Sequence, residues 1–254
     1  MKLFFRKLGE GRPLVILHGV FGSSDNLFTV SKHLAENGFA VYILDARNHG
    51  QSPHSAAFNY DEMAGDLNTF LEDHQLQNPI ILGHSMGGKT VMQFAQNYDN
   101  FEKLIVVDIA PKYYPPHHQH IIDGLRAIPI DELKSRKEAE EIFGQYVSDL
   151  GERQFILKNI YRTEDGGFAW RLNVPVIAEN IEEVGAEIVA QRKIEKPVLF
   201  IRGGESPYIS DADFKQIQDT FTQAKLITIP GANHWVHATQ PKAFLETVLD
   251  FANE

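Results

Sequence analysis

The sequence contains no cysteine among its 254 residues. Disulfide bonds, thiolate metal ligands and a cysteine nucleophile are therefore excluded, and the composition suits a reducing compartment such as the cytoplasm, where we expect the protein. No stretch of about eighteen apolar residues occurs, so the sequence predicts no membrane span. The apolar run after Lys2 is too short for a secretory signal peptide.

Positive charge is also scarce, because 24 Lys and Arg residues stand against 34 Asp and Glu residues and give a formal net charge of −10. This balance disfavours nonspecific attraction to nucleic acid or to an anionic membrane, so the expected partner is a small molecule. The length allows one large domain or a core with an insertion. We expect a monomer or a homodimer.

The most informative stretch is Ile80–Lys89, in which an apolar run leads into Gly83-His84-Ser85-Met86-Gly87 and then into residues with helical spacing. Strand, Gly-x-Ser-x-Gly and helix together are typical of a nucleophile elbow. The turn is strained, and side chains at the two glycines would collide with neighbouring backbone. It pushes the serine hydroxyl out of the sheet and directs the N–H of Met86 toward the same point. The alternative is a glycine-bounded loop with an incidental serine.

Buried strands and amphipathic helices alternate along most of the chain. Apolar runs predict strands at 13–19, 41–46, 80–84, 104–109, 198–202 and 226–229, and helical spacing occurs at 27–37, 60–74 and 241–251. Such alternation indicates an α/β protein with a mostly parallel, twisted sheet and helices on both faces. The first strand, Leu3–Leu8, is expected to be an antiparallel edge strand.

One block breaks this alternation. Between residues 111 and 193 no stretch resembles a buried strand, and helical patterns dominate at 120–127, 130–150, 151–160 and 176–190. We therefore expect a core domain of residues 1–110 and 194–254 with a helical lid inserted at 111–193, on the side of the carboxyl ends of the strands. The alternative is extra packing with no role in access to a site.

A serine hydroxyl needs a base to become a good nucleophile, and histidine serves best near neutral pH. In a sheet of this order the base is expected after the last strand, where His234 and His237 lie. We favour His234, because His237 is expected to enter the last helix. His18, His49 and His84 are expected to be hydrogen-bonded structural residues near the site.

A carboxylate should orient this histidine, and two are in competition. Glu205 lies in the loop after the penultimate strand, but the register expected for the acid falls on Ser206 instead. Asp108 ends the strand that follows the nucleophile helix, at the sheet edge that carries function in open sheets. An unpaired carboxylate buried there would be unfavourable, so we favour Asp108.

The second donor of the oxyanion hole, beside the Met86 N–H, is expected to be the N–H of Phe21 in the glycine-rich loop after the second strand. Trp170, Trp235 and His84 are the candidate substrate-binding residues. His117, His118 and His120 could suggest a metal site, but their spacing is a weak signal and a solvated hinge is favoured. The sequence therefore predicts neither a metal ion nor a cofactor.

With these residues in view, the chain resembles the α/β-hydrolase superfamily along nearly its full length. The resemblance is carried by His18-Gly19-x-Phe21-Gly22, Asp45-x-Arg47-Asn48-His49-Gly50, the elbow, and Gly231-Ala232-Asn233-His234-Trp235. More narrowly, Gly88-Lys89-Thr90, Val107-Asp108-Ile109-Ala110-Pro111 and Gly204-x-Ser206-Pro207-Tyr208 are similar to the YbfF-type bacterial esterases. That resemblance implies Ser85, Asp108 and His234 as the catalytic triad.

The resulting hypothesis is a serine hydrolase that cleaves carboxylic esters or acyl thioesters of short to medium chain length through an acyl-enzyme, with acyl-CoA among the substrates that the resemblance implies. One alternative is a lyase or C–C bond hydrolase on the same scaffold. Another is a small-molecule-binding protein without catalysis. Dehalogenase and epoxide-hydrolase chemistry is disfavoured, because it needs a carboxylate where Ser85 stands.

Overall fold

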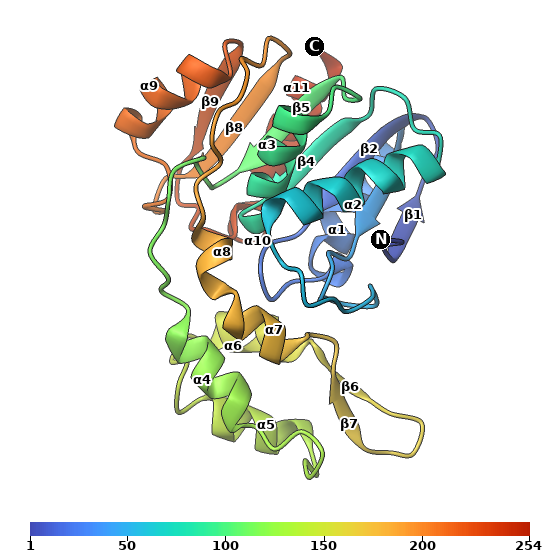
Figure 1. Ribbon diagram of the computed structural model, residues 1–254, viewed down its shortest axis with the longest axis vertical. Helices are drawn as coiled ribbons and strands as arrows, with labels where there is room; N and C mark the ends of the chain where they lie inside the picture. The colour runs from blue at the N-terminus through green and yellow to red at the C-terminus, as the bar shows by residue number, and fades with distance from the viewer.

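A computed structural model describes residues 1–254 and is built on a seven-stranded sheet with the order β1-β3-β2-β4-β5-β8-β9 (Figure 1). The strands are β1 (Phe5–Leu8), β2 (Arg12–Leu17), β3 (Phe39–Leu44), β4 (Ile80–His84), β5 (Lys103–Val107), β8 (Val198–Gly203) and β9 (Ala224–Ile229). Only β1 is antiparallel to its neighbour, and every other pair is parallel. The mostly parallel sheet with an antiparallel edge strand is thus confirmed.

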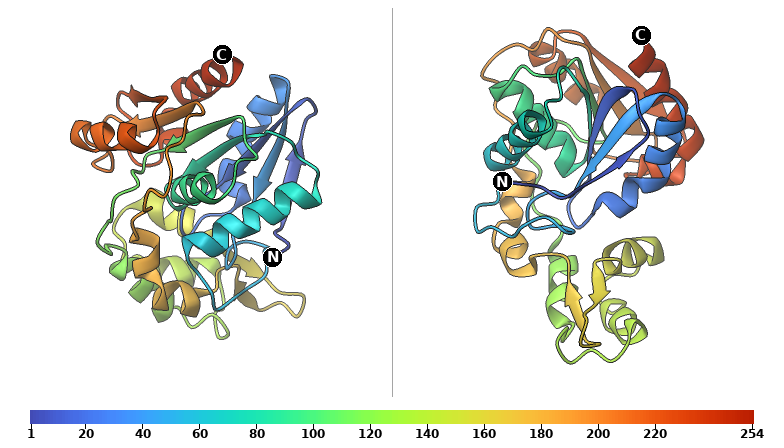
Figure 2. Two further views of the ribbon diagram at one scale, coloured as in Figure 1. Left: turned by 45° about the horizontal axis from the view of Figure 1, so that its top comes forward. Right: turned by 90° about the vertical axis from the view of Figure 1, so that its right-hand side faces the viewer.

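Both faces of the sheet are covered by helices, as Figure 2 shows. Successive strand residues alternate between two cores, so that Leu14 faces one core and Val15 the other. One face packs on α1 (Ser24–Glu36) and α11 (Pro241–Asn253), which follows the short α10 (Val236–Thr239). The other face packs on α2 (Tyr60–Asp73), α3 (Met86–Asn97) and α9 (Asp211–Thr220). None of the helices is both long and apolar enough to span a membrane.

The parallel strands end at one edge of the sheet. In the registers of β2 with β4 and of β4 with β5, Leu17 lies beside Gly83 and Gly83 beside Val106. The loops that follow these strands therefore start side by side, and so do those after β8 and β9. Residues far apart in the sequence, such as Ser85 and Asp108, are brought together at this carboxyl edge.

A second lobe is inserted between β5 and β8 and lies beyond the carboxyl edge (Figures 1 and 2). We name residues 111–193 the cap. It contains α4 (Gln119–Ala127), α5 (Arg136–Phe143), α6 (Leu150–Leu157), β6 (Ile160–Arg162), β7 (Phe168–Trp170), α7 (Val174–Glu179) and α8 (Ile181–Gly185). Its apolar residues, such as Ile121 and Phe143, belong to the same core as the adjacent face of the sheet.

Helices dominate the cap, as expected, but it also contains a strand pair that the sequence did not predict. Residues 160–162 and 168–170 form an antiparallel hairpin, which turns through the Asp165-Gly166-Gly167 stretch. Its strands have three residues each, too few to show an alternating pattern in the sequence. The helix expected over 130–150 is also limited to Arg136–Phe143, where Ser135 caps the helix by accepting a hydrogen bond from the Glu138 N–H.

Candidate active site

The nucleophile elbow is present between β4 and α3. Ser85 has φ 53° and ψ −116°, a positive-φ conformation that is strained for a residue with a side chain. A Cβ atom at Gly83 would lie 2.1 Å from the Gly87 carbonyl oxygen, and one at Gly87 would lie 2.5 Å from that of Leu17. Only glycine therefore fits on both sides of the serine. Met86 begins α3, and its N–H is one of the first-turn donors that the helix itself leaves unpaired.

Asp108 follows β5 directly, has φ 53° and is fully buried. Its Oδ1 accepts a hydrogen bond from the Gly203 N–H at 2.9 Å, and its Oδ2 accepts one from the Ser206 hydroxyl. The same Oδ2 lies 2.8 Å from Nδ1 of His234. Three donors thus compensate for the loss of solvation of this carboxylate, and they hold it in the position needed to orient an imidazole.

The structure distinguishes between Asp108 and Glu205, the two carboxylates that the sequence offered as the partner of His234. Glu205 is exposed, and its backbone N–H donates to the Ala232 carbonyl at 2.9 Å. Ser206, at the register where an acid was expected, donates its hydroxyl to Asp108 instead. The Asp108 side chain is therefore the one that contacts His234.

Ser85 and His234 line the same cavity, which has a volume of about 170 Å³. No hydrogen bond of 3.5 Å or less joins the Ser85 hydroxyl to the imidazole. Such contacts are often long in an enzyme without substrate and shorten when the substrate binds. The backbone carbonyl of His234 lies 2.9 Å from Nε2 of His84, which ties the loop after β9 to the end of β4.

The loop after β2, residues 18–23, forms one wall of the cavity. Phe21 has φ 60°, and its N–H donates to Nε2 of His49 at 3.3 Å. For this N–H to act as an oxyanion donor, as the sequence predicts, it must exchange the imidazole for the substrate oxygen. The carbonyl of Phe21 accepts a hydrogen bond from the side chain of Asn159 at 2.7 Å, so the cap helps to fix this loop.

Three histidines near the site support the loops around it. His18 accepts a hydrogen bond from the Ala46 N–H at 3.0 Å, and Nδ1 of His49 lies 2.8 Å from the Arg47 carbonyl. Burial lowers the pKa of His49 to about 3 and lowers the pKa of His84 well below its usual value. These imidazoles are consequently neutral near pH 7, so His18 and His49 can accept backbone N–H groups while His84 donates to the His234 carbonyl. His237, the other candidate base, packs against His84 and Phe244 rather than lining the cavity.

The cap supplies much of the remaining cavity wall, and its lining residues were not identified from the sequence. The cavity is lined on this side by His117, His118, His120, Ile121, Glu152, Phe155 and Ile156. Burial lowers the pKa of His118 to about 3, so this side chain is also neutral. The three histidines thus line the cavity, with His117 and His120 exposed to solvent, and no group of side chains with the composition of a metal site is found.

Tyr208 is a further residue at the site, and the sequence did not identify it as a candidate site residue. Its ring stacks on the His234 imidazole with centroids 4.1 Å apart and planes 21° apart. Its hydroxyl lies 2.6 Å from Nε2 of His117, and burial raises its pKa to about 12, so it remains a neutral phenol that can donate this hydrogen bond. The only signal in the sequence was its place in the Gly204-x-Ser206-Pro207-Tyr208 motif.

The three candidate substrate-binding residues have different surroundings. Trp235 and His84 line the cavity, and the Trp235 ring packs 5.8 Å from that of Phe155. Trp170 does not line the cavity; it ends β7, where it pairs with Ile160. It was assigned to the pocket as an aromatic residue of the lid, but in the structure it belongs to the β6–β7 hairpin, away from the cavity.

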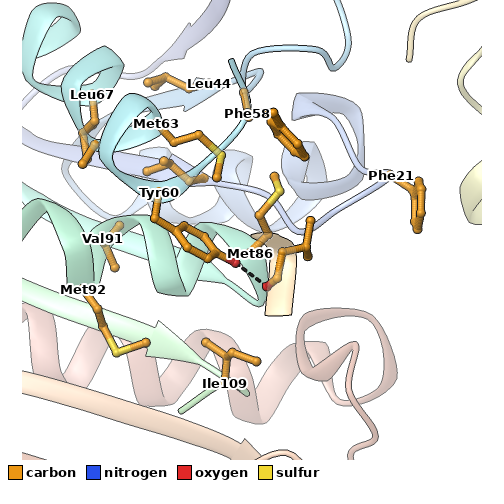
Figure 3. Packing of buried hydrophobic residues seen from close by; sticks show 14 of the residues in the cluster. Phe21, Leu44, Phe58, Tyr60, Met63, Leu67, Met86, Val91, Met92 and Ile109 are labelled. Carbon is orange, nitrogen blue, oxygen red and sulfur yellow. Dashed lines mark hydrogen bonds between the residues drawn. The ribbon is translucent and has the colours of Figure 1, made fainter. Parts of the chain in front are cut away.

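Figure 3 shows the packing beneath the elbow. Met86 of α3 lies near Met63 of α2, and Ile109 approaches from the end of β5, whereas Phe21 stands apart on its loop. The strained residues are thus backed by a close-packed core. A positive φ costs about 1–3 kcal/mol at a residue with a side chain, and it persists in a folded protein only where the surrounding packing fixes it.

Comparison with known proteins extends these observations. Residues 12–158 match the family model of the alpha/beta hydrolase fold. Esterase YbfF of Escherichia coli (strain K12) is 38% identical over 247 residues, which cover 95% of this chain and 93% of that protein. The sn-1-specific diacylglycerol lipase ABHD11 of Danio rerio is 38% identical over 251 residues, which cover 96% of this chain and 79% of that protein.

A solved structure described as a marine microorganism esterase has 45% sequence identity to this chain and a TM-score of 0.96, and the match covers 99% of both chains. The family model spans more than half of the chain, and the similarity to YbfF spans nearly all of it. The sheet order, the elbow and both kinds of comparison agree. The chain belongs to the α/β-hydrolase family.

Proposed function

We propose that the protein is a serine hydrolase that cleaves carboxylic esters or acyl thioesters, with Ser85, His234 and Asp108 as its triad. One observation carries the proposal: the buried Asp108 carboxylate lies 2.8 Å from Nδ1 of His234, and this imidazole lines the same cavity as the elbow serine. The names of similar proteins, esterase YbfF and a diacylglycerol lipase, support ester bonds as the substrate class.

The reaction follows from the placement of these groups. His234 Nε2 takes the proton of the Ser85 hydroxyl as Oγ attacks the carbonyl carbon, and the Met86 N–H stabilises the oxyanion that forms. The leaving alcohol or thiol takes that proton, and an acyl group remains on Ser85. Water then attacks the acyl-enzyme with His234 as base. Phe21 is the proposed second oxyanion donor once its N–H leaves His49.

The size of the cavity limits the acyl group. Its volume of about 170 Å³ is close to that of an engineered apolar cavity of about 150 Å³ that holds benzene. An acyl chain with about as many carbons as benzene therefore fits within the cavity. Phe155, Ile156 and Trp235 supply its apolar walls. We propose that short acyl chains are preferred over long ones.

The experiment that tests the function replaces the nucleophile. Ser85→Ala should reduce the hydrolysis of p-nitrophenyl butyrate by about 10⁴-fold or more, because removal of a serine nucleophile leaves only binding and the oxyanion hole. Circular dichroism should show an unchanged fold, since the side chain loses a single oxygen atom. Hydrolysis by the folded variant at the wild-type rate would defeat the proposal.

A further inference from the structure

Lys89 is a fully buried lysine that the proposed mechanism does not use. It lies in the first turn of α3, and its backbone N–H donates to the Ser85 carbonyl at 3.0 Å, so it is placed one helical turn after the nucleophile. Lysine is almost never fully buried unless it is paired, because loss of hydration is costly. Its burial here calls for specific partners.

The partners are backbone carbonyls of the cap. The Lys89 Nζ donates to the carbonyl oxygens of Lys112 at 2.8 Å and Gly185 at 3.1 Å, and also to that of Ala186. An ammonium group has three donors, and all three find an acceptor. The rings of Tyr60 and Tyr114 lie 5.8 and 4.9 Å from the same nitrogen, within the range of cation–π attraction.

These carbonyls lie in the two segments that connect the cap to the sheet, residues 111–114 and 185–188, which we name the connections. The connections also bind each other, because the Tyr114 N–H donates to Gly185 at 2.8 Å and the Ile188 N–H donates to Pro111 at 2.7 Å. Both chain crossings between cap and core therefore meet at the amino group of Lys89.

The start of α2 adds a further anchor beside this group. The Tyr60 hydroxyl donates to the Val184 carbonyl at 2.6 Å, just before the second connection. Figure 3 shows Tyr60 beside Met86, with this hydrogen bond as a dashed line. The connections are thus fixed to α2 and α3, the helices that pack around the elbow. The first connection is also tied to α9 by the Lys112–Asp213 ion pair and to the loop after β8 by the hydrogen bond from the Tyr114 hydroxyl to the Tyr208 carbonyl.

We propose that Lys89 is a positioning residue for hydrolysis: its amino group joins both connections to the nucleophile helix and so holds the cap wall of the cavity over Ser85. The proposal rests on the proposed function, because it concerns the same cavity. Lys89 touches no reacting atom, and it acts through the cap residues that line the site. Its loss should therefore weaken substrate binding more than it slows the chemical step.

The test compares two buried lysines. Lys89→Met removes the amino group while keeping a side chain of similar length. Lys103→Met is the matched control, because the Lys103 Nζ is also buried and donates to two carbonyls, Phe251 at 3.0 Å and Ala252 at 3.4 Å. Lys103 begins β5 at the end opposite Asp108, away from the cap. Both variants should lose thermal stability.

Only Lys89→Met should affect the site. Its KM for p-nitrophenyl butyrate should rise about tenfold or more, the factor that corresponds to loss of about one hydrogen bond, with kcat little changed. Hydrogen exchange at the amides of Tyr114 and Ile188 should become faster than in the wild type. Lys89→Gln, which keeps two N–H donors, should give intermediate values. Lys103→Met should match the wild type in both measurements.

Equal stability losses in the two methionine variants, with wild-type KM and wild-type exchange at the connections, would overturn the proposal. If Lys89→Met does not fold, Lys89→Gln takes its place, and a wild-type KM in that variant has the same meaning. Titration of the reactive serine with a fluorophosphonate separates the two hypotheses. Absence of labelling in the wild type removes the proposed function, whereas labelling with an unchanged KM removes only the role of Lys89.

Discussion

The carboxyl edge of the sheet and the cap contribute to the same cavity in different ways. At the edge, Ser85 and Asp108 are buried, have positive φ and directly follow the parallel strands β4 and β5. In the cap, the lining residues come from α4, α6 and the segment before α4, and residues such as His117 are exposed. The edge thus has a conformation imposed by its backbone, whereas the cap is held by side-chain contacts.

This difference suggests a division of roles, in which the sheet edge carries out the reaction and the cap determines which substrates are preferred. Reacting groups must stay within a fraction of an ångström of a productive geometry, which strand ends provide. The cap can vary its lining residues without changing that geometry, because it approaches from outside the sheet. We therefore expect substitutions at the edge to reduce the rate on every substrate, and substitutions in the cap to change the order of preference among substrates.

The largest effect is expected at the edge, for Asp108→Asn. The amide keeps the size of the carboxylate but cannot stabilise the imidazolium, so kcat for p-nitrophenyl butyrate should fall about 10⁴-fold. Glu205→Gln is the control, because Glu205 is exposed and should leave the rate unchanged. The reverse result, with the larger loss in Glu205→Gln, would move the acid to the loop after β8.

A smaller effect is expected in the cap, for Phe155→Ala. This side chain lines the cavity and packs against Trp235, so its removal enlarges the acyl site. The ratio of kcat/KM for octanoyl over butyryl p-nitrophenyl esters should rise about tenfold, the discrimination typical of one or two methylenes. Tyr161→Ala, in β6 away from the cavity, should leave this ratio unchanged. An equal loss on both esters would contradict the assignment of selection to the cap.

The smallest expected effect is a pH dependence at the connections, where Lys89 links the cap to the sheet. Burial lowers the pKa of Lys89 to about 7, although Glu187 favours the charged form. If the connections open and water reaches the amino group, the pKa of Lys89 returns toward 10.5. At pH values above about 7 the open state therefore binds more protons than the closed state. Because of this difference, the closed state gains stability relative to the open state as pH rises through 7. The pKa values of Tyr60 and Tyr114 are raised by burial, so these groups do not titrate in this range.

Protection of the Tyr114 and Ile188 amides against hydrogen exchange, corrected for the intrinsic rate, should therefore rise roughly fourfold between pH 6 and pH 7.5. The same amides in Lys89→Met should show no such rise, because the titrating group is missing. A wild-type profile that is flat, or that falls with pH, would show that this lysine does not titrate between the closed and open states.

The same contrast explains how far the sequence alone could lead. Continuous apolar runs and the glycines around Ser85 report local backbone needs, so the sheet and the elbow were predictable. The partner of His234 was harder, because Ser206 occupies the register of the acid and only the structure shows its hydroxyl on Asp108. The hairpin that removes Trp170 from the cavity has strands of three residues, which are too short to leave a periodic signal.

The cap wall was the least predictable part. His117 and Tyr208 are 91 positions apart, and their contact depends on how the cap packs on the core. No local sequence pattern predicts that packing, because neither His117 nor Tyr208 lies in a pattern that distinguishes it from other polar or aromatic residues. The role of Lys89 is hidden for the same reason, because its partners are backbone carbonyls, which any sequence would supply.

The central claim, that Ser85 forms an acyl-enzyme beside His234, is tested most directly by intact-mass analysis after brief exposure to p-nitrophenyl butyrate. We expect a mass increase of one butyryl group, located by peptide mapping to Ser85, and no increase in Ser85→Ala. An adduct that persists in Ser85→Ala, or ester turnover with no adduct in the wild type even after rapid quenching, would contradict the account.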